Sequence, residues 1–106
     1  MSVRPEVADL LLLGPFPAED ADEAVIVRYQ TAIEKIKRPI SDEEAGLLLG
    51  LFGPDDCYGG AWALLHLIES APHGAPLTSQ PLDTDNEWLR RLWARAHRVA
   101  KPKPVA

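Results

Sequence analysis

Apolar residues recur along this chain at intervals of three and four positions, which is the spacing of one face of an α-helix. The pattern predicts five helices and no convincing strand. The first helix covers roughly residues 6–13 and ends at Gly14 and Pro15, which are typical helix-stop residues. The leucine run at 10–13 also fits a buried strand, and the local pattern leaves that alternative open.

Two further helices carry start signals. Asp20 followed by Glu23 resembles a capping box, so the second helix is expected to begin near Asp20 and to stop at Pro39. The segment Ser41–Glu44 is a clearer capping box and starts the third helix, which Gly53–Pro54 ends.

The fourth helix is expected over residues 57–70, two or three loop residues after the third. Because short connections join antiparallel neighbours, these two helices should form an αα-hairpin. The proline-rich segment 71–82 is a loop that Leu77 and Leu82 are placed to hold against the core. A fifth helix begins with a capping box at residues 84–87, and its apolar face is Trp88, Leu89, Leu92, Trp93 and Ala96.

These elements predict an all-α fold: a compact bundle of four to five helices around a central αα-hairpin. The 106 residues, 46% of them hydrophobic, suit a single domain. We assign residues 1–100 to that domain and residues 101–106 to a flexible basic C-terminal tail.

Cysteine content and the N-terminal pattern point to a cytoplasmic protein. The lone Cys57 excludes an internal disulfide and a cysteine-based zinc site. The first residues carry proline and acid where a signal peptide has basic and then apolar residues, and the apolar run at 10–13 is too short to span a membrane.

Charge is distributed unevenly along the chain. Residues 1–83 hold 14 acids and 5 bases, a net charge of −9, whereas residues 84–106 hold 2 acids and 6 bases, a net charge of +4. An acidic body repels nucleic acid and attracts basic partners, while the basic C-terminal part has the opposite preference.

The outer face of the fourth helix is the sharpest functional signal. Ala61, Leu64, Leu65 and Ile68 form the core side of this helix. Four large or polar side chains fall on the opposite side: Tyr58, Trp62, His66 and Glu69. An outward-facing tryptophan and tyrosine favour a partner-binding surface. The alternative is that Trp62 packs under the 71–82 loop or against the fifth helix.

Asp55 and Asp56 precede this helix and allow two interpretations. One of them caps the helix while the other favours its dipole, or the pair forms an acidic lip beside Tyr58 that receives a Lys or Arg of a partner. Gly59 and Gly60 are unfavourable inside a helix. Either the helix starts later or something approaches the backbone closely there.

No cluster of residues reads as a catalytic or metal centre, so we expect neither an enzyme nor a cofactor. Cys57 and His66 are nine residues apart on one helix and point differently, which excludes a nucleophile–base pair within it. His66, Glu69 and His73 lack an established ligand spacing.

Arginines gather on the fifth helix, where Arg91, Arg95 and Arg98 share a face. They can complement the helix dipole, pair with the acidic body, or bind nucleic acid together with Trp88 and Trp93. The sequence pI of about 5.1 is far from the basic profile of a nucleic-acid binder.

The stretch Ser41–Pro72, with its leucine-rich hairpin, its acidic loop Gly53–Gly60 and the segment Trp62–Glu69, resembles small acidic helical bacterial immunity proteins. The resemblance covers about a third of the chain. It implies tight, stoichiometric binding to a toxin domain, often at that toxin's active site. Many such toxins are nucleases with basic clefts, which an acidic partner suits electrostatically.

The sequence therefore favours a cytoplasmic protein-binding module, an immunity protein or antitoxin that occludes a basic toxin domain. The expected partner-binding residues are Asp55, Asp56, Tyr58, Trp62, His66 and Glu69. The alternatives are a small nucleic-acid-associated or regulatory protein that uses the basic C-terminal helix, and an adaptor that dimerises through the Trp62 face.

Overall fold

The structure, a computed structural model, describes residues 3–77, 80–82 and 85–100, and within these ranges it contains helices and no strand. The predicted all-α class is confirmed, and the leucine run at 10–13 is helical. In chain order the elements are α1 (Pro5–Leu13), α2 (Glu23–Glu34), α3 (Asp42–Leu48), the 3-10 helix η1 (Leu49–Leu51), α4 (Gly60–Glu69) and α5 (Glu87–Ala100). The predicted tail at 101–106 and Thr84 of the fifth capping box lie outside the described residues.

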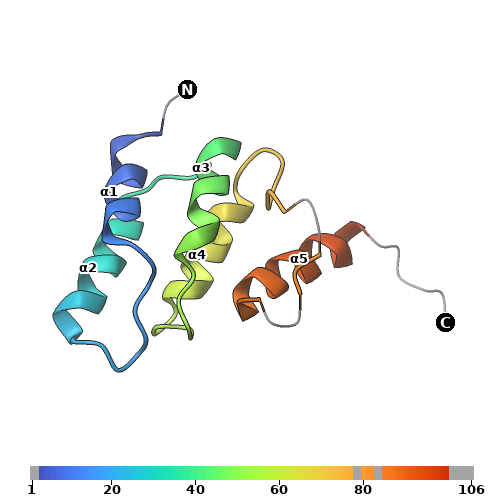
Figure 1. The fold of residues 1–106 in the computed structure, drawn as a ribbon. Coiled ribbons are helices and arrows are strands. Elements are labelled where there is room, and N and C mark those ends of the chain that lie inside the picture. Colours follow the sequence, from blue (N-terminus) through green and yellow to red (C-terminus); the bar gives the residue numbers. More distant parts are fainter. Residues whose placement is uncertain (1–2, 78–79, 83–84, 101–106) are drawn as a thin grey trace.

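Two helical hairpins lie side by side, and α5 flanks the second (Figure 1). α1 runs antiparallel to α2, and α3 with η1 runs antiparallel to α4. The N-terminal ends of α1 and α3 are therefore at one end of this four-helix unit, and the α1–α2 and α3–α4 connections are at the other end.

The core forms where the predicted apolar faces meet. The four residues assigned to the core side of α4 are each at most 1% exposed: Ala61, Leu64, Leu65 and Ile68. They pack with α1 residues such as Val7 and Leu10 and with Trp88 and Leu92 of α5. This common core is what holds five short helices together, since isolated helices of this length are marginal in water.

Two predicted helix starts had different outcomes. At α3 the capping box is confirmed, because the Ser41 side chain accepts from the Glu44 N–H while the Glu44 carboxylate accepts from the Ser41 N–H. At α2 the prediction was wrong. The helix begins at Glu23 after Asp22, with no side-chain cap, and it ends at Glu34 instead of continuing to Pro39.

The connections also differ from the predicted ones. The α3–α4 hairpin forms, but its connection runs from 52 to 59 because α4 starts at Gly60, three residues later than predicted. In the 71–82 segment, Leu77 packs against the core while Leu82 is 69% exposed, so only the first of the two expected contacts is made.

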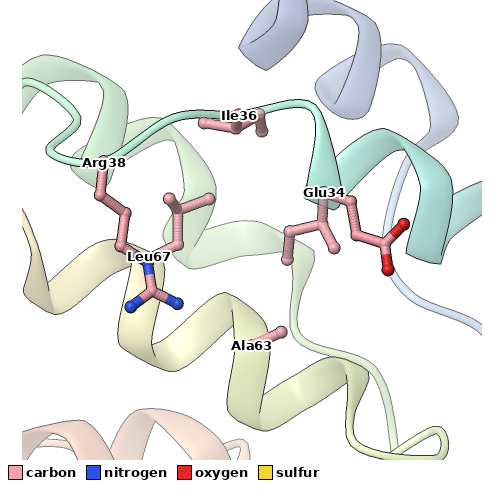
Figure 2. Close-up of a pocket in the computed structure, with 6 residues that line it drawn as sticks. Glu34, Ile36, Arg38, Ala63 and Leu67 are labelled. Carbon is pink, nitrogen blue, oxygen red and sulfur yellow. The ribbon is translucent and has the colours of Figure 1, made fainter.

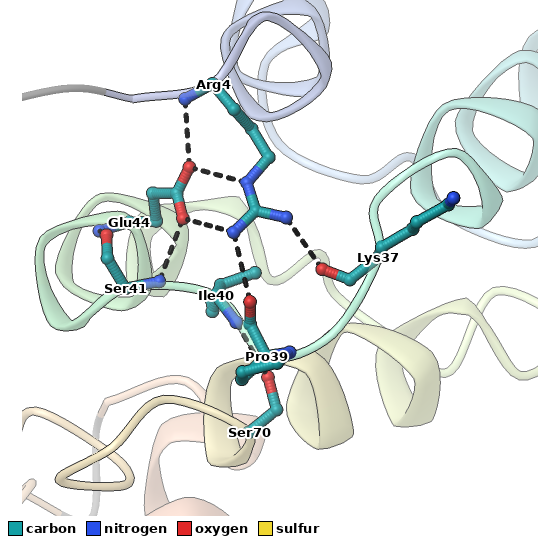
Figure 3. Close-up of polar contacts among 7 residues, drawn as sticks. All are labelled: Arg4, Lys37, Pro39, Ile40, Ser41, Glu44 and Ser70. Carbon is teal, nitrogen blue, oxygen red and sulfur yellow. Dashed lines mark hydrogen bonds and ion pairs between the residues drawn. The ribbon is translucent and has the colours of Figure 1, made fainter.

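A polar clamp closes the end of the unit at the N-termini of α1 and α3 (Figure 3). The Glu44 carboxylate, 2% exposed, accepts hydrogen bonds from the Arg4 N–H, Arg4 Nε, Arg4 Nη2 and the Ser41 N–H. The Arg4 guanidinium also donates to the carbonyl oxygens of Lys37 and Pro39. Burial raises the pKa of Glu44, but the hydrogen bonds from Ser41 and Arg4 outweigh it and hold that pKa below its usual value.

Candidate functional site

The α3–α4 connection is a tight turn with an unusual backbone. Cys57, Tyr58 and Gly59 have φ angles of 48°, 54° and 89°, all in the left-handed region. That region is unfavourable for residues with a Cβ. Side chains of the same segment hold the turn, because Asp55 Oδ1 accepts from the Cys57 N–H at 2.9 Å and Asp56 Oδ2 accepts from the Gly59 N–H at 3.0 Å. Both aspartates therefore shape the turn that presents Tyr58.

The α1–α2 connection lies against this turn and is hydrogen-bonded to it. The Glu19 N–H donates to Asp55 Oδ2 at 3.0 Å, and the Tyr58 hydroxyl donates to the Glu19 carbonyl oxygen at 3.2 Å. The Tyr58 N–H makes a longer contact of 3.4 Å with the Glu19 carboxylate. These contacts join residues 36 to 39 positions apart and fix Tyr58 relative to the acidic α1–α2 loop.

Two glycines permit this close approach. A Cβ on Gly53 would lie 2.2 Å from the Phe16 carbonyl oxygen, and a Cβ on Gly60 would lie 2.8 Å from the Phe16 ring. Phe16 itself is buried, and its ring packs against Tyr29 with centroids 4.8 Å apart. Both interpretations of the Gly59–Gly60 pair are thus correct: the helix starts later, and a neighbouring segment approaches the backbone.

We call the surface formed by residues 19–23 and 55–58 the acidic end. These two stretches contain six carboxylates and no lysine or arginine: Glu19, Asp20, Asp22, Glu23, Asp55 and Asp56. The Tyr58 side chain belongs to the same surface, is 64% exposed and bonds through its hydroxyl to Glu19. Beside it is a cleft of about 350 Å³ lined by Glu19, Ala21, Glu23, Ile26, Val27, Gln30 and Tyr58.

The cysteine of this turn is not placed to act as a nucleophile. Cys57 is 1% exposed, and burial, followed by the nearby carboxylates of Asp55, Glu19 and Asp56, raises the pKa of its thiol. A buried thiol with a raised pKa stays protonated and behaves as a small apolar side chain.

The remaining predicted site residues lie along α4, where α5 covers part of them. Trp62 is half-buried and meets Trp88 of α5 edge to face at 5.2 Å between ring centroids. The Arg91 guanidinium lies 5.4 Å from the Trp62 ring and 4.7 Å from the Trp88 ring. The structure thus shows the alternative in which Trp62 packs against the fifth helix.

The polar residues of the same stripe differ in exposure. Glu69 forms an ion pair with Arg95 of α5 at 2.7 Å, whereas His66 is exposed, with its ring 5.9 Å from that of Trp62. Because the helix starts at Gly60, Tyr58 does not belong to this stripe.

The structure therefore separates the six predicted residues into two groups. Asp55, Asp56 and Tyr58 meet at the acidic end, and Trp62, His66 and Glu69 lie along α4, where Trp62 and Glu69 contact α5. Glu19 and Glu23 also belong to this site and were not among the predicted residues. The run of acids at 19–23 was the available signal, but the local pattern predicts only a capping box there, for a helix that in fact begins at Glu23.

Three arginines of α5 make contacts within the part of the protein that the structure describes. Arg91 pairs with Glu87 at 2.6 Å, Arg95 pairs with Glu69, and Arg90 Nε donates to the Asp85 carbonyl oxygen. Of the sequence alternatives for these residues, pairing with the acidic body is the one the described contacts show for Arg95, whereas Arg91 pairs with Glu87 of α5 itself.

The described residues contain no cluster of three or more His, Cys, Asp or Glu side chains that would hold a metal ion. Within the same ranges, none of the helices has the length and apolar character needed to cross a membrane. Comparison with protein-family models, with curated proteins and with solved structures yields no match.

Proposed function

We propose that this protein is a protein-binding module whose acidic end docks on a basic surface of a partner. The most concrete form of the proposal is an immunity protein or antitoxin that binds and occludes a basic toxin domain. The observation that carries it is an exposed tyrosine, fixed by hydrogen bonds between two short stretches that together hold six carboxylates and no base.

Each part of this arrangement suits a protein interface. Tyrosine is enriched among residues that dominate binding energy, because it buries a large ring at a small cost in conformational entropy. Carboxylates around such a ring select a basic partner and speed association through long-range attraction. Since the turn is held in place by Asp55 and Glu19 before any partner arrives, little ordering is required on binding.

In our proposal, the second group of predicted residues, Trp62, His66 and Glu69, forms the flank of this interface. Trp62 lies in the first turn of α4, directly after the turn that carries Tyr58, and its ring is partly accessible beside α5. His66 is exposed further along the same helix, while Glu69 is held by Arg95 and contributes less. Tyr58 is therefore the main anchor and Trp62 a secondary one.

The experiment starts with wild-type protein as bait in a lysate of the source cells, followed by recombinant expression of the captured partner. We expect a basic protein that binds with one-to-one stoichiometry and more weakly at high salt. Tyr58→Ala should weaken the measured affinity by about 2 kcal/mol, the size of a typical hot spot.

A matched control removes a carboxylate at the opposite end of the molecule. Glu43 is exposed in the first turn of α3, and Glu43→Gln should leave the affinity unchanged. If the partner is toxic, its expression alone should arrest growth, and co-expression of wild type but not of Tyr58→Ala should restore it.

The proposal fails if Tyr58→Ala binds the captured partner as tightly as wild type. It also fails if the purified protein instead binds RNA or DNA with an affinity that falls steeply with salt and that Arg91→Ala with Arg95→Ala abolishes, because that outcome assigns the function to α5.

A further inference from the structure

A second concave site lies away from the acidic end, between α4 and the link that joins α2 to α3 (Figure 2). This cleft has a volume of about 210 Å³. Four of its six lining residues are aliphatic, and the other two are one base and one acid: Ile33, Ile36, Ala63, Leu67, Arg38 and Glu34. For scale, a dry cavity of about 150 Å³ is enough to hold benzene.

The charged lining residues have different orientations. The Arg38 side chain reaches from the link toward α4 at the Leu67 side of the cleft, whereas the Glu34 carboxylate points away from the cleft (Figure 2). The cleft therefore presents a cation above an apolar floor.

The backbone that carries Arg38 is fixed from the opposite side. The carbonyl oxygens of its two neighbours, Lys37 and Pro39, accept hydrogen bonds from Arg4 at 2.7 and 3.0 Å (Figure 3). Arg4 is in turn held by the buried Glu44 carboxylate. The position of Arg38 is thus determined by the polar clamp, and a group placed on rigid backbone is suited to recognition.

The Arg38 guanidinium is also free to bind. Within the residues that the structure describes, it has no hydrogen bond, ion pair or ring contact, although Arg4, Arg91 and Arg95 each pair with a carboxylate. Guanidinium is the side-chain group that matches the two oxygens of a carboxylate with parallel hydrogen bonds. The aliphatic floor gives a favourable environment for an apolar group attached to that carboxylate.

We propose that this cleft binds a small monocarboxylate with an apolar body of about the size of a benzene ring, such as an aromatic or branched aliphatic acid. The carboxylate pairs with Arg38, and the apolar body lies on Ala63, Leu67 and the isoleucines of the link. This site is distinct from the acidic end and does not depend on the proposed function.

Benzoate is the probe for this proposal, and benzamide is its uncharged control of the same shape. Titration of the isotope-labelled full chain, followed by backbone amide chemical shifts, should show saturable changes confined to residues 33–38 and 63–67. Because hydrogen bonds to charged groups contribute about 1.5–3 kcal/mol, benzamide should bind about tenfold more weakly or worse.

Three variants separate specific binding from general attraction. Arg38→Gln should weaken benzoate binding about tenfold or more while leaving benzamide unchanged. Lys37→Gln removes a neighbouring charge that does not line the cleft and should have little effect. Ala63→Leu should fill the floor and weaken both probes, and circular dichroism checks that each variant is folded.

The proposal is wrong if benzoate produces no saturable change, if benzamide binds equally well, or if Arg38→Gln binds benzoate like wild type. Equal losses in Arg38→Gln and Lys37→Gln would also contradict it, since that result means non-specific attraction to a basic segment.

Discussion

At one end of the four-helix unit a single carboxylate is buried and fully bonded, while at the other end two short stretches carry six carboxylates, four of them exposed. Glu44, 2% exposed, accepts four hydrogen bonds from Arg4 and Ser41. At the acidic end, Asp55 and Glu19 bond mainly to backbone groups of the two connections, and Tyr58 is 64% exposed.

The comparison shows two uses of the same chemical group. A buried carboxylate with an arginine partner fixes how α1, the α2–α3 link and α3 meet, and removing either partner leaves an uncompensated charge. At the acidic end, Asp55 and Asp56 hold the turn, whereas the four exposed carboxylates of residues 19–23 contribute little to stability and favour recognition of a base. Stability and binding are therefore expected to respond to substitutions at opposite ends.

The largest effect is expected from Glu44→Ala. The change strips Arg4 and the Ser41 N–H of their acceptor inside the protein. Since one-sided loss of a buried ion pair is strongly destabilising, we expect about 3 kcal/mol less free energy of unfolding, measured by urea denaturation followed at 222 nm. Glu43→Gln on the same helix is the control and should change little.

The dependence of stability on pH gives a second test of the role of Glu44. The pKa of Glu44 is lowered in the folded state, so its contribution is present above the usual carboxyl pKa and is lost as pH falls through the lowered value. Glu44→Gln should therefore reduce the difference in stability between neutral and acidic pH. An unchanged pH dependence would show that the clamp does not act as described.

The second effect concerns Trp62→Ala. Replacing a fully buried tryptophan with alanine lowers the free energy of unfolding by about 3–5 kcal/mol. Because Trp62 is half-buried against Trp88, we expect a loss of about 2 kcal/mol. Limited proteolysis should cut more rapidly near α5. Tyr58→Ala, measured in parallel, should change stability by less than about 0.5 kcal/mol. Similar losses for both would remove the distinction between an exposed anchor and a packed one.

A smaller effect of opposite sign is expected from Tyr58→Gly. Tyr58 has φ of 54°, and the left-handed region costs a residue with a Cβ about 1 kcal/mol relative to glycine. The variant should gain up to about 1 kcal/mol in stability and lose partner affinity, whereas Tyr58→Phe should retain both the strain and the ring. A destabilised Tyr58→Gly would mean that the hydroxyl bond to Glu19 outweighs the backbone strain.

The smallest effect is on an exposed pair near the clamp, His73 and Asp42. The hydrogen bond and charge of Asp42 raise the pKa of His73, and His73 lowers the pKa of Asp42. The ion pair therefore forms only when the pH lies between the two pKa values. It is lost as pH rises through the raised imidazole pKa and as pH falls through the lowered carboxyl pKa. In NMR titrations Asp42→Asn should lower the His73 midpoint; an unmoved midpoint would show that the pair does not form in solution.

What the sequence determined about this protein is its local structure. The capping box at Ser41 and the core side of α4 were predictable because both depend on residues within one or two turns of each other. The concentration of acidic residues in the α1–α2 and α3–α4 connections also follows directly from the sequence. The start of α4 was misplaced because periodicity continues through Gly59 and Gly60, and their conformation does not follow from residue type alone.

Only the tertiary structure decided which distant groups meet. Glu44 bonds to Arg4, which is 40 positions away in the sequence, and Glu19 contacts Tyr58, which is 39 positions away. Such contacts depend on how the two hairpins pack, which a local pattern does not encode, since many pairings bury the same apolar faces. For this reason the sequence supplied the carboxylates and aromatic rings, while packing determined that one acid is a clamp, that Trp62 lies against α5, and that Tyr58 remains exposed.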